Sequence, residues 1–127
     1  MRAAYVDTSC LVAIALAEAG AAQALRSLQS YDVLLSSNLL EAELRATLER
    51  ENVGDDPGIF LGAISWVYPD RPLTSEIATV LSTGYVKGAD LWHLAVALFF
   101  DPLHEIAFLT LDARQQEISE QLGFGHR

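Results

Sequence analysis

The chain has 127 residues, of which 51% are hydrophobic and 20% are charged. This composition is that of a globular protein rather than a disordered one, and the length predicts a single domain over residues 1–127. The formal net charge is −9, from 17 acidic and 8 basic residues. Such a surface disfavours nucleic acid binding, which depends largely on phosphate neutralisation, unless cations or a local basic patch intervene.

Two features bear on the cellular location. Cys10 is the only cysteine, so the chain cannot form an internal disulfide, and it is interpreted as a small buried hydrophobic residue. The apolar stretch 10–17 is flanked by Asp7 and Glu18, which argues against a signal peptide, and no stretch approaches the ~20 apolar residues of a membrane span. We therefore expect a soluble, cytoplasmic protein with no membrane partner.

The apolar periodicity and the helix signals predict strands that alternate with helices. Such alternation is typical of an α/β sandwich with a mainly parallel sheet. The first predicted elements are a strand over 3–6, a helix from an N-cap at Ser9 to about Gly20, a helix over 21–29, a strand over 33–36 and a helix over 39–51 capped by Asn38. After them come a helical or irregular segment over 59–67, a helix over 74–81 with Thr74 or Ser75 near its cap, an apolar helix over 90–100, a strand over 106–110, and a helix over 113–121 ended by Gly123.

Two aspartates directly follow predicted strands. Asp7 ends the stretch "AAYVD" and Asp112 ends the stretch "FLTLD". Ligands of parallel sheets bind at the carboxyl ends of the strands, so these two side chains are placed to share one edge of the sheet. A buried carboxylate needs a compensating partner, because removing its charge from water costs free energy.

The helix predicted over 39–51 directs one acidic side chain inward. With Leu40 set at zero, Glu43 falls at about −60°, inside the apolar arc of the helix. Glu41 falls on the margin of that arc, and Glu49 faces water. A buried glutamate is rare unless it is paired or bound to a metal ion.

Asp90 opens the apolar helix after the residues "KGA". Asp90, Asp7 and Asp112 could each be a helix cap, which stabilises a helix by about 1 kcal/mol and needs no further function. Together with an inward Glu43, however, the three aspartates form the set of oxygen ligands that Mg²⁺ and Mn²⁺ prefer, and clustered carboxylates repel one another without a cation. Both interpretations are open at this point.

Four segments resemble the acidic motifs of the PIN domain family, in the usual order and spacing: "YVDTS", "SNLLEAEL", "KGADLWHLAVAL" and "FLTLDARQ". The similarity covers essentially the whole chain and includes the VapC-type ribonuclease toxins of toxin–antitoxin modules. It implies a three-layer α/β/α sandwich with a mainly parallel central sheet. It also implies an endoribonuclease that depends on Mg²⁺ or Mn²⁺, cuts RNA, is commonly a homodimer, and is inhibited by an antitoxin protein.

The resemblance assigns roles by motif position. The residues matching the family's acidic quartet, expected to be catalytic and to bind metal, are Asp7, Glu43, Asp90 and Asp112. Residues with a supporting role are Thr110, which matches the hydroxyl residue before the last acid, and Thr8 or Ser9, which match the polar residue after the first.

Other residues near these motifs are open to simpler interpretations. Lys87 and Arg114 are placed to meet substrate phosphate. His93 is interpreted as a core histidine with a hydrogen bond rather than as a base. Trp92, Phe99 and Phe100 cover a second apolar face of the 90–100 helix, which is either core or subunit interface.

Three other classes of protein were weighed. A receiver-like, metal-binding signalling domain would need an acidic neighbour beside Asp7 and a lone aspartate after a central strand. A haloacid dehalogenase phosphatase would need an aspartate where this chain has Ser9. A PIN-fold protein that binds RNA or a partner without cutting is disfavoured because acids stand at all four motif positions.

Overall fold

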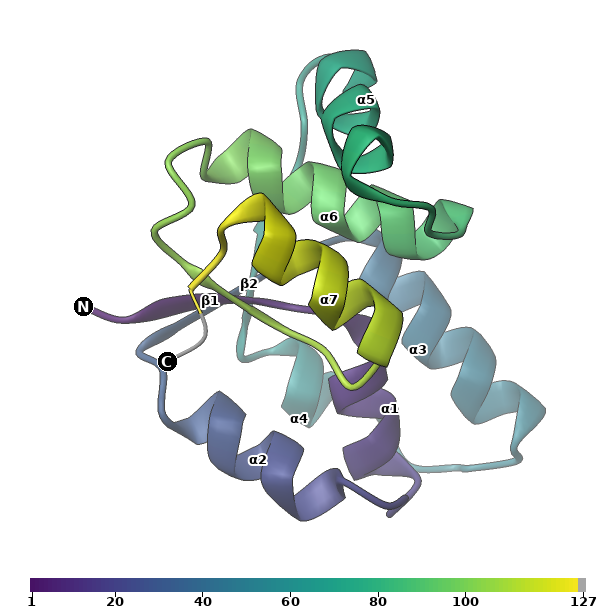
Figure 1. Ribbon diagram of the computed structural model, residues 1–127. Coiled ribbons are helices and arrows are strands. Elements are labelled where there is room, and N and C mark those ends of the chain that lie inside the picture. The colour runs from purple at the N-terminus through teal and green to yellow at the C-terminus, as the bar shows by residue number, and fades with distance from the viewer. Residues whose placement is uncertain (126–127) are drawn as a thin grey trace.

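The computed structural model describes residues 1–125, in which four strands and seven helices form one layered body (Figure 1). The strands are β1 (Ala3–Val6), β2 (Val33–Ser37), β3 (Ile64–Val67) and β4 (Ala107–Leu109). The helices are α1 (Thr8–Ala15), α2 (Ala21–Gln29), α3 (Leu39–Arg50), α4 (Gly58–Leu61), α5 (Thr74–Thr83), α6 (Gly88–Phe100) and α7 (Ala113–Leu122).

All four strands are parallel, in the order β3-β2-β1-β4. The chain therefore builds outward from β1 through β2 to β3 and then crosses back to place β4 on the other side of β1. In the register, Tyr5 of β1 is opposite Leu35 of β2 and Phe108 of β4. The direction of winding reverses at β1, and a reversal of this kind opens a crevice at the carboxyl ends of the strands.

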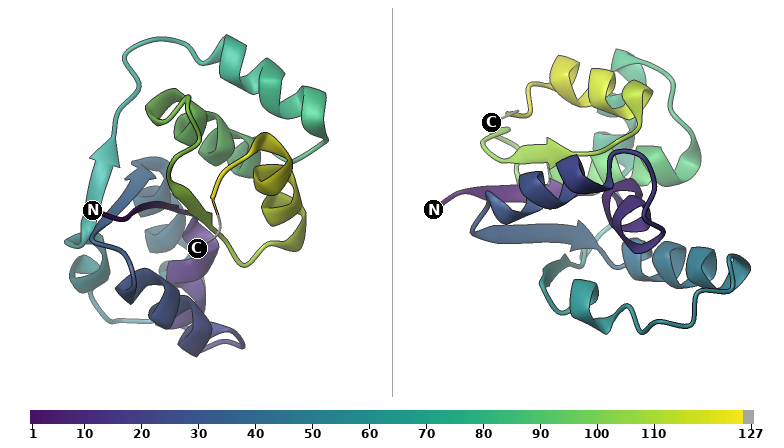
Figure 2. Two further views of the ribbon diagram at one scale, coloured as in Figure 1. Left: turned by 60° about the vertical axis from the view of Figure 1, so that its left-hand side comes forward. Right: turned by 90° about the horizontal axis from the view of Figure 1, so that it is seen from below.

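Helices cover both faces of the sheet, which confirms the predicted α/β/α sandwich (Figure 2). Helices α5, α6 and α7 pack on one face around Tyr5, Leu94 and Phe108, and the other face carries α1 to α4 around Val6 and Leu40. Tyr5 and Val6 are neighbours in β1 but belong to different cores, because successive side chains of a strand point to opposite faces.

Helix α6 is the central helix, as its apolar sequence predicts. Its residues His93 to Leu98 are all buried. Trp92 and Phe99 are half-buried against the same core, whereas Phe100 at the end of the helix is 47% exposed. None of the helices within residues 1–125 combines the length and the apolar character needed to cross a membrane.

The sequence prediction was wrong for the segment over 59–67. It contains the short helix α4 and then β3, an edge strand that pairs with β2 through Ile64 and Val67. The strand has only four residues, and Ser65 is exposed because the strand lies at the edge of the sheet. So short an apolar run does not distinguish a strand from a helix.

The first helix was also misplaced at both ends. Asp7, not Ser9, is the N-cap of α1, because its carboxylate accepts a hydrogen bond from the Ser9 backbone amide. The helix ends at Ala15 rather than near Gly20, and Ala17 takes a left-handed turn conformation with φ 52°. Gly20, with φ 90°, then occupies the N-cap position of α2, where a left-handed backbone favours glycine.

Three further capping predictions need correction. Asn38 stands at the N-cap position of α3 without a side-chain bond, and the Ser37 hydroxyl accepts from the Leu39 amide instead. Leu73 occupies the N-cap position of α5, so neither Thr74 nor Ser75 does. Asp90 lies in the first turn of α6, which begins at Gly88. The predicted end of α7 at Gly123 is confirmed, with φ 97°.

We expect the core around α6 to be sensitive to loss of volume. Leu94 is fully buried, so Leu94→Ala should lower the free energy of unfolding by about 2–5 kcal/mol. Leu103→Ala is the control, since that side chain is 75% exposed and its loss should change stability by less than about 0.5 kcal/mol. Urea denaturation of both variants measures the difference, and equal stabilities would contradict the packing described here.

Candidate active site

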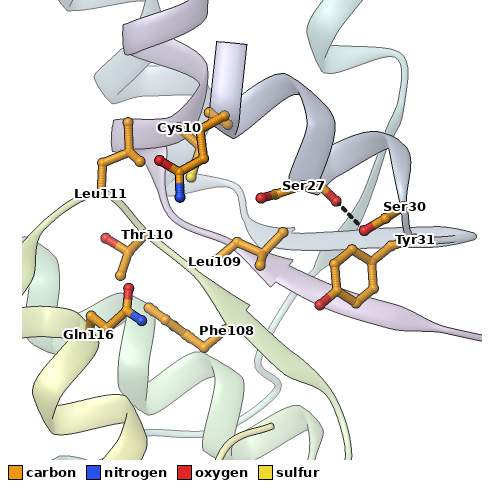
Figure 3. A pocket seen from close by; sticks show the side chains of 11 residues that line it. Cys10, Ser27, Ser30, Tyr31, Phe108, Leu109, Thr110, Leu111 and Gln116 are labelled. Atoms are coloured by element: carbon orange, nitrogen blue, oxygen red, sulfur yellow. Dashed lines mark hydrogen bonds between the residues drawn. The ribbon is translucent and has the colours of Figure 1, made fainter. Parts of the chain in front are cut away.

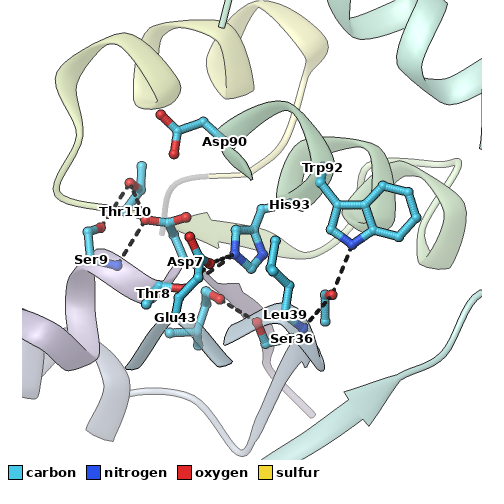
Figure 4. A network of polar contacts seen from close by, with 12 residues as sticks. Asp7, Thr8, Ser9, Ser36, Leu39, Glu43, Asp90, Trp92, His93 and Thr110 are labelled. Atoms are coloured by element: carbon cyan, nitrogen blue, oxygen red, sulfur yellow. Dashed lines mark hydrogen bonds and ion pairs between the residues drawn. The ribbon is translucent and has the colours of Figure 1, made fainter. Parts of the chain in front are cut away.

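Four acidic side chains come from segments that meet at the carboxyl edge of the sheet, and Figure 4 shows three of them, Asp7, Glu43 and Asp90. Asp7 directly follows β1, and Asp112 lies three residues beyond the end of β4, the strand next to β1. Glu43 is in the second turn of α3, the helix that follows β2, and Asp90 is in the first turn of α6. The expected sharing of one sheet edge by Asp7 and Asp112 is therefore confirmed.

Asp7 is the most buried of the four, at 4% exposure. One of its oxygens, Oδ2, accepts from the Ser9 amide at 3.0 Å and from the Thr110 hydroxyl at 3.3 Å. The other oxygen, Oδ1, accepts from Gln115 Nε2 at 3.1 Å. Asp7 is thus a helix cap and a member of the acidic site at once, so the two interpretations of this residue do not exclude each other.

Glu43 is half-buried and points toward α6, as its helical position predicts. Its Oε1 accepts from the Thr8 hydroxyl at 2.7 Å and lies 2.8 Å from His93 Nε2. Partial burial alone would raise the pKa of Glu43, but the hydrogen bonds from His93 and Thr8 outweigh it and hold that pKa below its usual value. Glu43 is therefore a carboxylate at neutral pH.

A buried chain of hydrogen bonds orients the His93 ring. The Ser37 amide donates to the Tyr5 hydroxyl, which lies 2.7 Å from His93 Nδ1. Burial raises the pKa of Tyr5 above its ordinary value, so the phenol stays protonated where it meets Nδ1. Nε2 carries a proton toward Glu43, because a carboxylate can only accept a hydrogen bond. The interpretation of His93 as a hydrogen-bonded core residue is confirmed, and the chain links it to the acidic site.

Asp90 differs from the other acids because its carboxylate makes no hydrogen bond within residues 1–125. It extends from the start of α6 on the side of Asp7 and Thr110 (Figure 4). Partial burial raises the pKa of Asp90, and the charges of Asp7, Asp112 and Glu43 raise it further. All three other carboxylates are therefore near enough to repel it.

Asp112 is linked to the hydroxyl residues Thr110 and Ser9. Asp112 caps α7, since its Oδ1 accepts from the Gln115 amide at 2.7 Å, so the capping interpretation holds for this residue too. Its own amide donates to the Thr110 hydroxyl, which lies 3.2 Å from the Ser9 hydroxyl. Thr8, Ser9 and Thr110, the predicted supporting residues, thus contact the acids directly.

Gln115 belongs to the site and was not singled out from the sequence. Its side chain is fully buried and contacts Asp7 and Thr110. Helical spacing, which identified Glu43 as an inward residue, does the same for Gln115. It places Gln115 on the buried face of α7 with Ile118, Ser119 and Leu122. An amide on such a face needs polar partners.

The two basic residues proposed to meet phosphate lie at the rim. Lys87 is exposed at the N-cap position of α6, three residues before Asp90. Arg114 is exposed at the start of α7, where it donates to the Tyr85 carbonyl and pairs with Glu117. Within residues 1–125 neither side chain forms a hydrogen bond or ion pair with the four acids, so these two residues do not neutralise the charge of the acids. Arg45 faces solvent and pairs with Glu41.

The four acids have the ligand chemistry of a divalent metal site, but their side chains are not placed to hold one ion together. Within residues 1–125, no three His, Cys, Asp or Glu side chains are placed so that they could hold one ion. Glu43 and Asp112 instead turn toward the hydrogen-bond donors His93 and Gln115, which relieves their mutual repulsion. Four carboxylates in electrostatic contact are nevertheless the ligands that a hard divalent cation prefers.

A concavity lies along β4, and Thr110, which bonds to Asp7, is in its lining (Figure 3). It measures about 210 Å³, and none of its lining side chains is charged at neutral pH. Cys10 lies in its lining, and burial, followed by the charge of Asp7, raises the pKa of this thiol to about 12. The thiol is therefore protonated, which confirms that Cys10 is a small buried residue and not a nucleophile.

Comparison with known proteins gives one family. The sequence model of the PIN domain matches residues 4–121, a span that includes all four acids. PIN domains are generally nucleases, and they generally use divalent metals. Comparison with curated proteins finds none that matches the chain.

The crowding at Asp90 predicts a measurable gain in stability when its charge is removed. Without metal at pH 7, Asp90→Asn should unfold at a higher temperature than the wild type, because the folded wild type carries the repulsion and the unfolded chain does not. The pKa of Asp90 is raised in the folded state, so lowering the pH through it protonates the wild type and should close the gap. Thermal unfolding in chelator over a pH series measures this, and a variant less stable at pH 7 would contradict the repulsion.

Proposed function

Because the chain belongs to the PIN domain family, we propose that it is a Mg²⁺- or Mn²⁺-dependent endoribonuclease and the toxin of a type II toxin–antitoxin system. The observation that carries the proposal is the meeting of Asp7, Glu43, Asp90 and Asp112 at the carboxyl edge of the sheet, where Asp90 is half-buried and close enough to the other three to be repelled by them. Such an arrangement costs stability in the absence of a ligand, and a divalent cation is the ligand that relieves it.

Asp7, Glu43, Asp90 and Asp112 are the residues that would hold the cation. When bound, a divalent ion lowers the pKa of a coordinated water and stabilises charge that develops on phosphate oxygens. Asp7 is fixed by the Ser9 amide and by Gln115, so its carboxylate is held in one orientation at the end of β1. Asp90 has no competing hydrogen bond within residues 1–125, which leaves its oxygens available as ligands.

His93 and Thr8 hold Glu43 in its ionised form at the floor of the site. The imidazole donates from Nε2 to Glu43, and its Nδ1 is held by the Tyr5 hydroxyl. Because the pKa of Glu43 is lowered in the folded protein, its hydrogen bonds stabilise the fold at pH values above its ordinary pKa. This stabilisation is lost as the pH falls through the lower pKa that Glu43 has in the folded state.

An acidic protein can bind RNA only if its negative charge is reduced where the phosphates approach. Two divalent ions would add four positive charges to the net charge of −9 and bring it to −5, with the whole change at the acidic edge. Lys87 and Arg114 are both exposed, Lys87 at the N-cap position of α6 and Arg114 in the first turn of α7. We propose that they meet the phosphates that flank the cut.

The proposal is tested by Asp7→Asn. Loss of one ligand charge should reduce RNA cleavage in Mg²⁺ or Mn²⁺ by about 100-fold or more, because several kcal/mol of charge stabilisation depend on the ion. The variant should remain folded, since an asparagine oxygen can still accept from the Ser9 amide. Cleavage of a labelled RNA and circular dichroism measure the two properties.

Asp56→Asn is the matched control for this substitution. Asp56 also accepts a hydrogen bond from the amide two residues later, that of Gly58, but it lies in an exposed turn outside the four acidic motifs. Its cleavage rate should equal that of the wild type. An Asp7→Asn protein that cuts RNA as fast as the wild type would contradict the proposal and favour a PIN-fold protein that binds without cutting.

A toxin of this kind also needs an inhibitor, and the site suggests its chemistry. A carboxylate cluster is blocked most directly by a basic side chain that replaces the cation, and a guanidinium can bind two carboxylates at once. The apolar part of such an antitoxin was expected along the helices that begin near Ser9 and Leu39. An apolar groove of about 270 Å³ does border α1, but its other walls are α2 and α4 rather than α3.

A homodimer, which the resemblance implies, likewise stays a proposal.

Binding of an antitoxin should compete with Mg²⁺ and weaken as the salt concentration rises, because both ligands would use the same carboxylates. Calorimetry of the pair with and without Mg²⁺ measures the competition. An affinity that does not change with Mg²⁺ would place the inhibition away from the acids.

A further inference from the structure

We infer that Gln115 is a positioning residue that presents Asp7 to a divalent cation, an inference that rests on the proposed function. Gln115 is fully buried in the first turns of α7, on the face that packs against α6 and β4. A buried amide is costly unless its donors and its acceptor are all satisfied. Each polar contact of this side chain leads to the acidic site.

The contacts of Gln115 connect three separate segments. Its Nε2 donates to Asp7 Oδ1 at 3.1 Å and to the Asp90 carbonyl at 3.3 Å. Its Oε1 accepts from the Thr110 hydroxyl at 2.6 Å. Its backbone amide donates to Asp112 Oδ1 at 2.7 Å. One residue therefore bonds to the carboxylates of Asp7 and Asp112 and to the backbone of Asp90.

The neutral amide suits this position better than the other side chains of similar size. A lysine would neutralise Asp7 and occupy the place of the cation, and a glutamate would add a fifth negative charge beside Asp7 Oδ1. A methionine would leave that buried oxygen without a donor, at a cost of about 1–3 kcal/mol. Glutamine satisfies Asp7 Oδ1 and leaves the charge of the carboxylate intact for a metal ion.

Outer contacts of this kind are expected to affect metal affinity. Partners that orient a metal ligand typically change the affinity by about 10–100-fold when they are removed. Gln115→Met removes the donor at similar volume, and Gln115→Asn keeps an amide that is too short to reach Asp7. Gln116→Met is the matched control, because Gln116 is the next residue of α7 and its side chain donates to Glu120, with no bond to the four acids in residues 1–125.

The test is calorimetric titration of the folded proteins with Mn²⁺, together with thermal unfolding in chelator and steady-state RNA cleavage. Both Gln115 variants should bind Mn²⁺ about 10-fold or more weakly, and their kcat should fall while the KM for RNA stays unchanged, since Gln115 lies beneath the acids. Gln116→Met should match the wild type in all three measurements. If Gln115→Met does not fold, Gln115→Asn carries the same test.

Two different results would overturn the inference, and they distinguish its own failure from that of the proposed function. Wild-type affinity for Mn²⁺ in the Gln115 variants, with only a lower unfolding temperature, would show that Gln115 stabilises the fold and nothing more. A wild-type protein that binds no Mn²⁺ at all would overturn the proposed function, and the inference about Gln115 with it.

Discussion

The repulsion among four carboxylates at one edge of a parallel sheet is the constraint on which the rest of the structure depends. Asp7 cannot move away, because it directly follows β1 and caps α1 at 4% exposure. Asp90 is carried to the same edge by the buried helix α6. The protein therefore surrounds the acids with uncharged donors, the Ser9 amide, the Thr8 and Thr110 hydroxyls and the Gln115 amide, which satisfy individual oxygens and leave the total charge in place.

The two sides of the site are stabilised by different means. Beneath Glu43, the chain of bonds through Ser37, Tyr5 and His93 runs into the core, so the orientation of that acid depends on buried groups. On the other side, Gln115 ties Asp7 to α6 and α7. The carboxylate of Asp90 makes no hydrogen bond in residues 1–125, although its backbone carbonyl accepts one from Gln115. A site with three tethered acids and one untethered acid is suited to accept a ligand, because the untethered group can adjust to it.

The sequence predicts the α/β/α fold, the inward direction of Glu43 and the shared edge of Asp7 and Asp112, because these follow from periodicity and from the position of residues at strand ends. It does not predict β3, whose four residues are too few to show a period. Ser9 was predicted as the cap of α1, but Asp7 immediately precedes the helix and caps it, so Asp7 is both a cap and a site residue. The sequence does not identify Gln115, because a neutral amide on the buried face of α7 gives a weaker signal than the inward carboxylate of Glu43. The convergence of the four carboxylates on one ion, which the motifs imply, is not found within residues 1–125, where Glu43 bonds to His93 and Asp112 to the Gln115 amide.

The central claim is that the acidic edge binds a divalent cation. Its most direct measurement is the anomalous scattering of Mn²⁺ in crystals grown with that ion. The account predicts a peak within bonding distance of oxygens from Asp7 and Asp90, with Glu43 or Asp112 turned away from its present partner toward the ion. A map without a peak at this edge, or with peaks only at exposed acids such as Glu49, would contradict it.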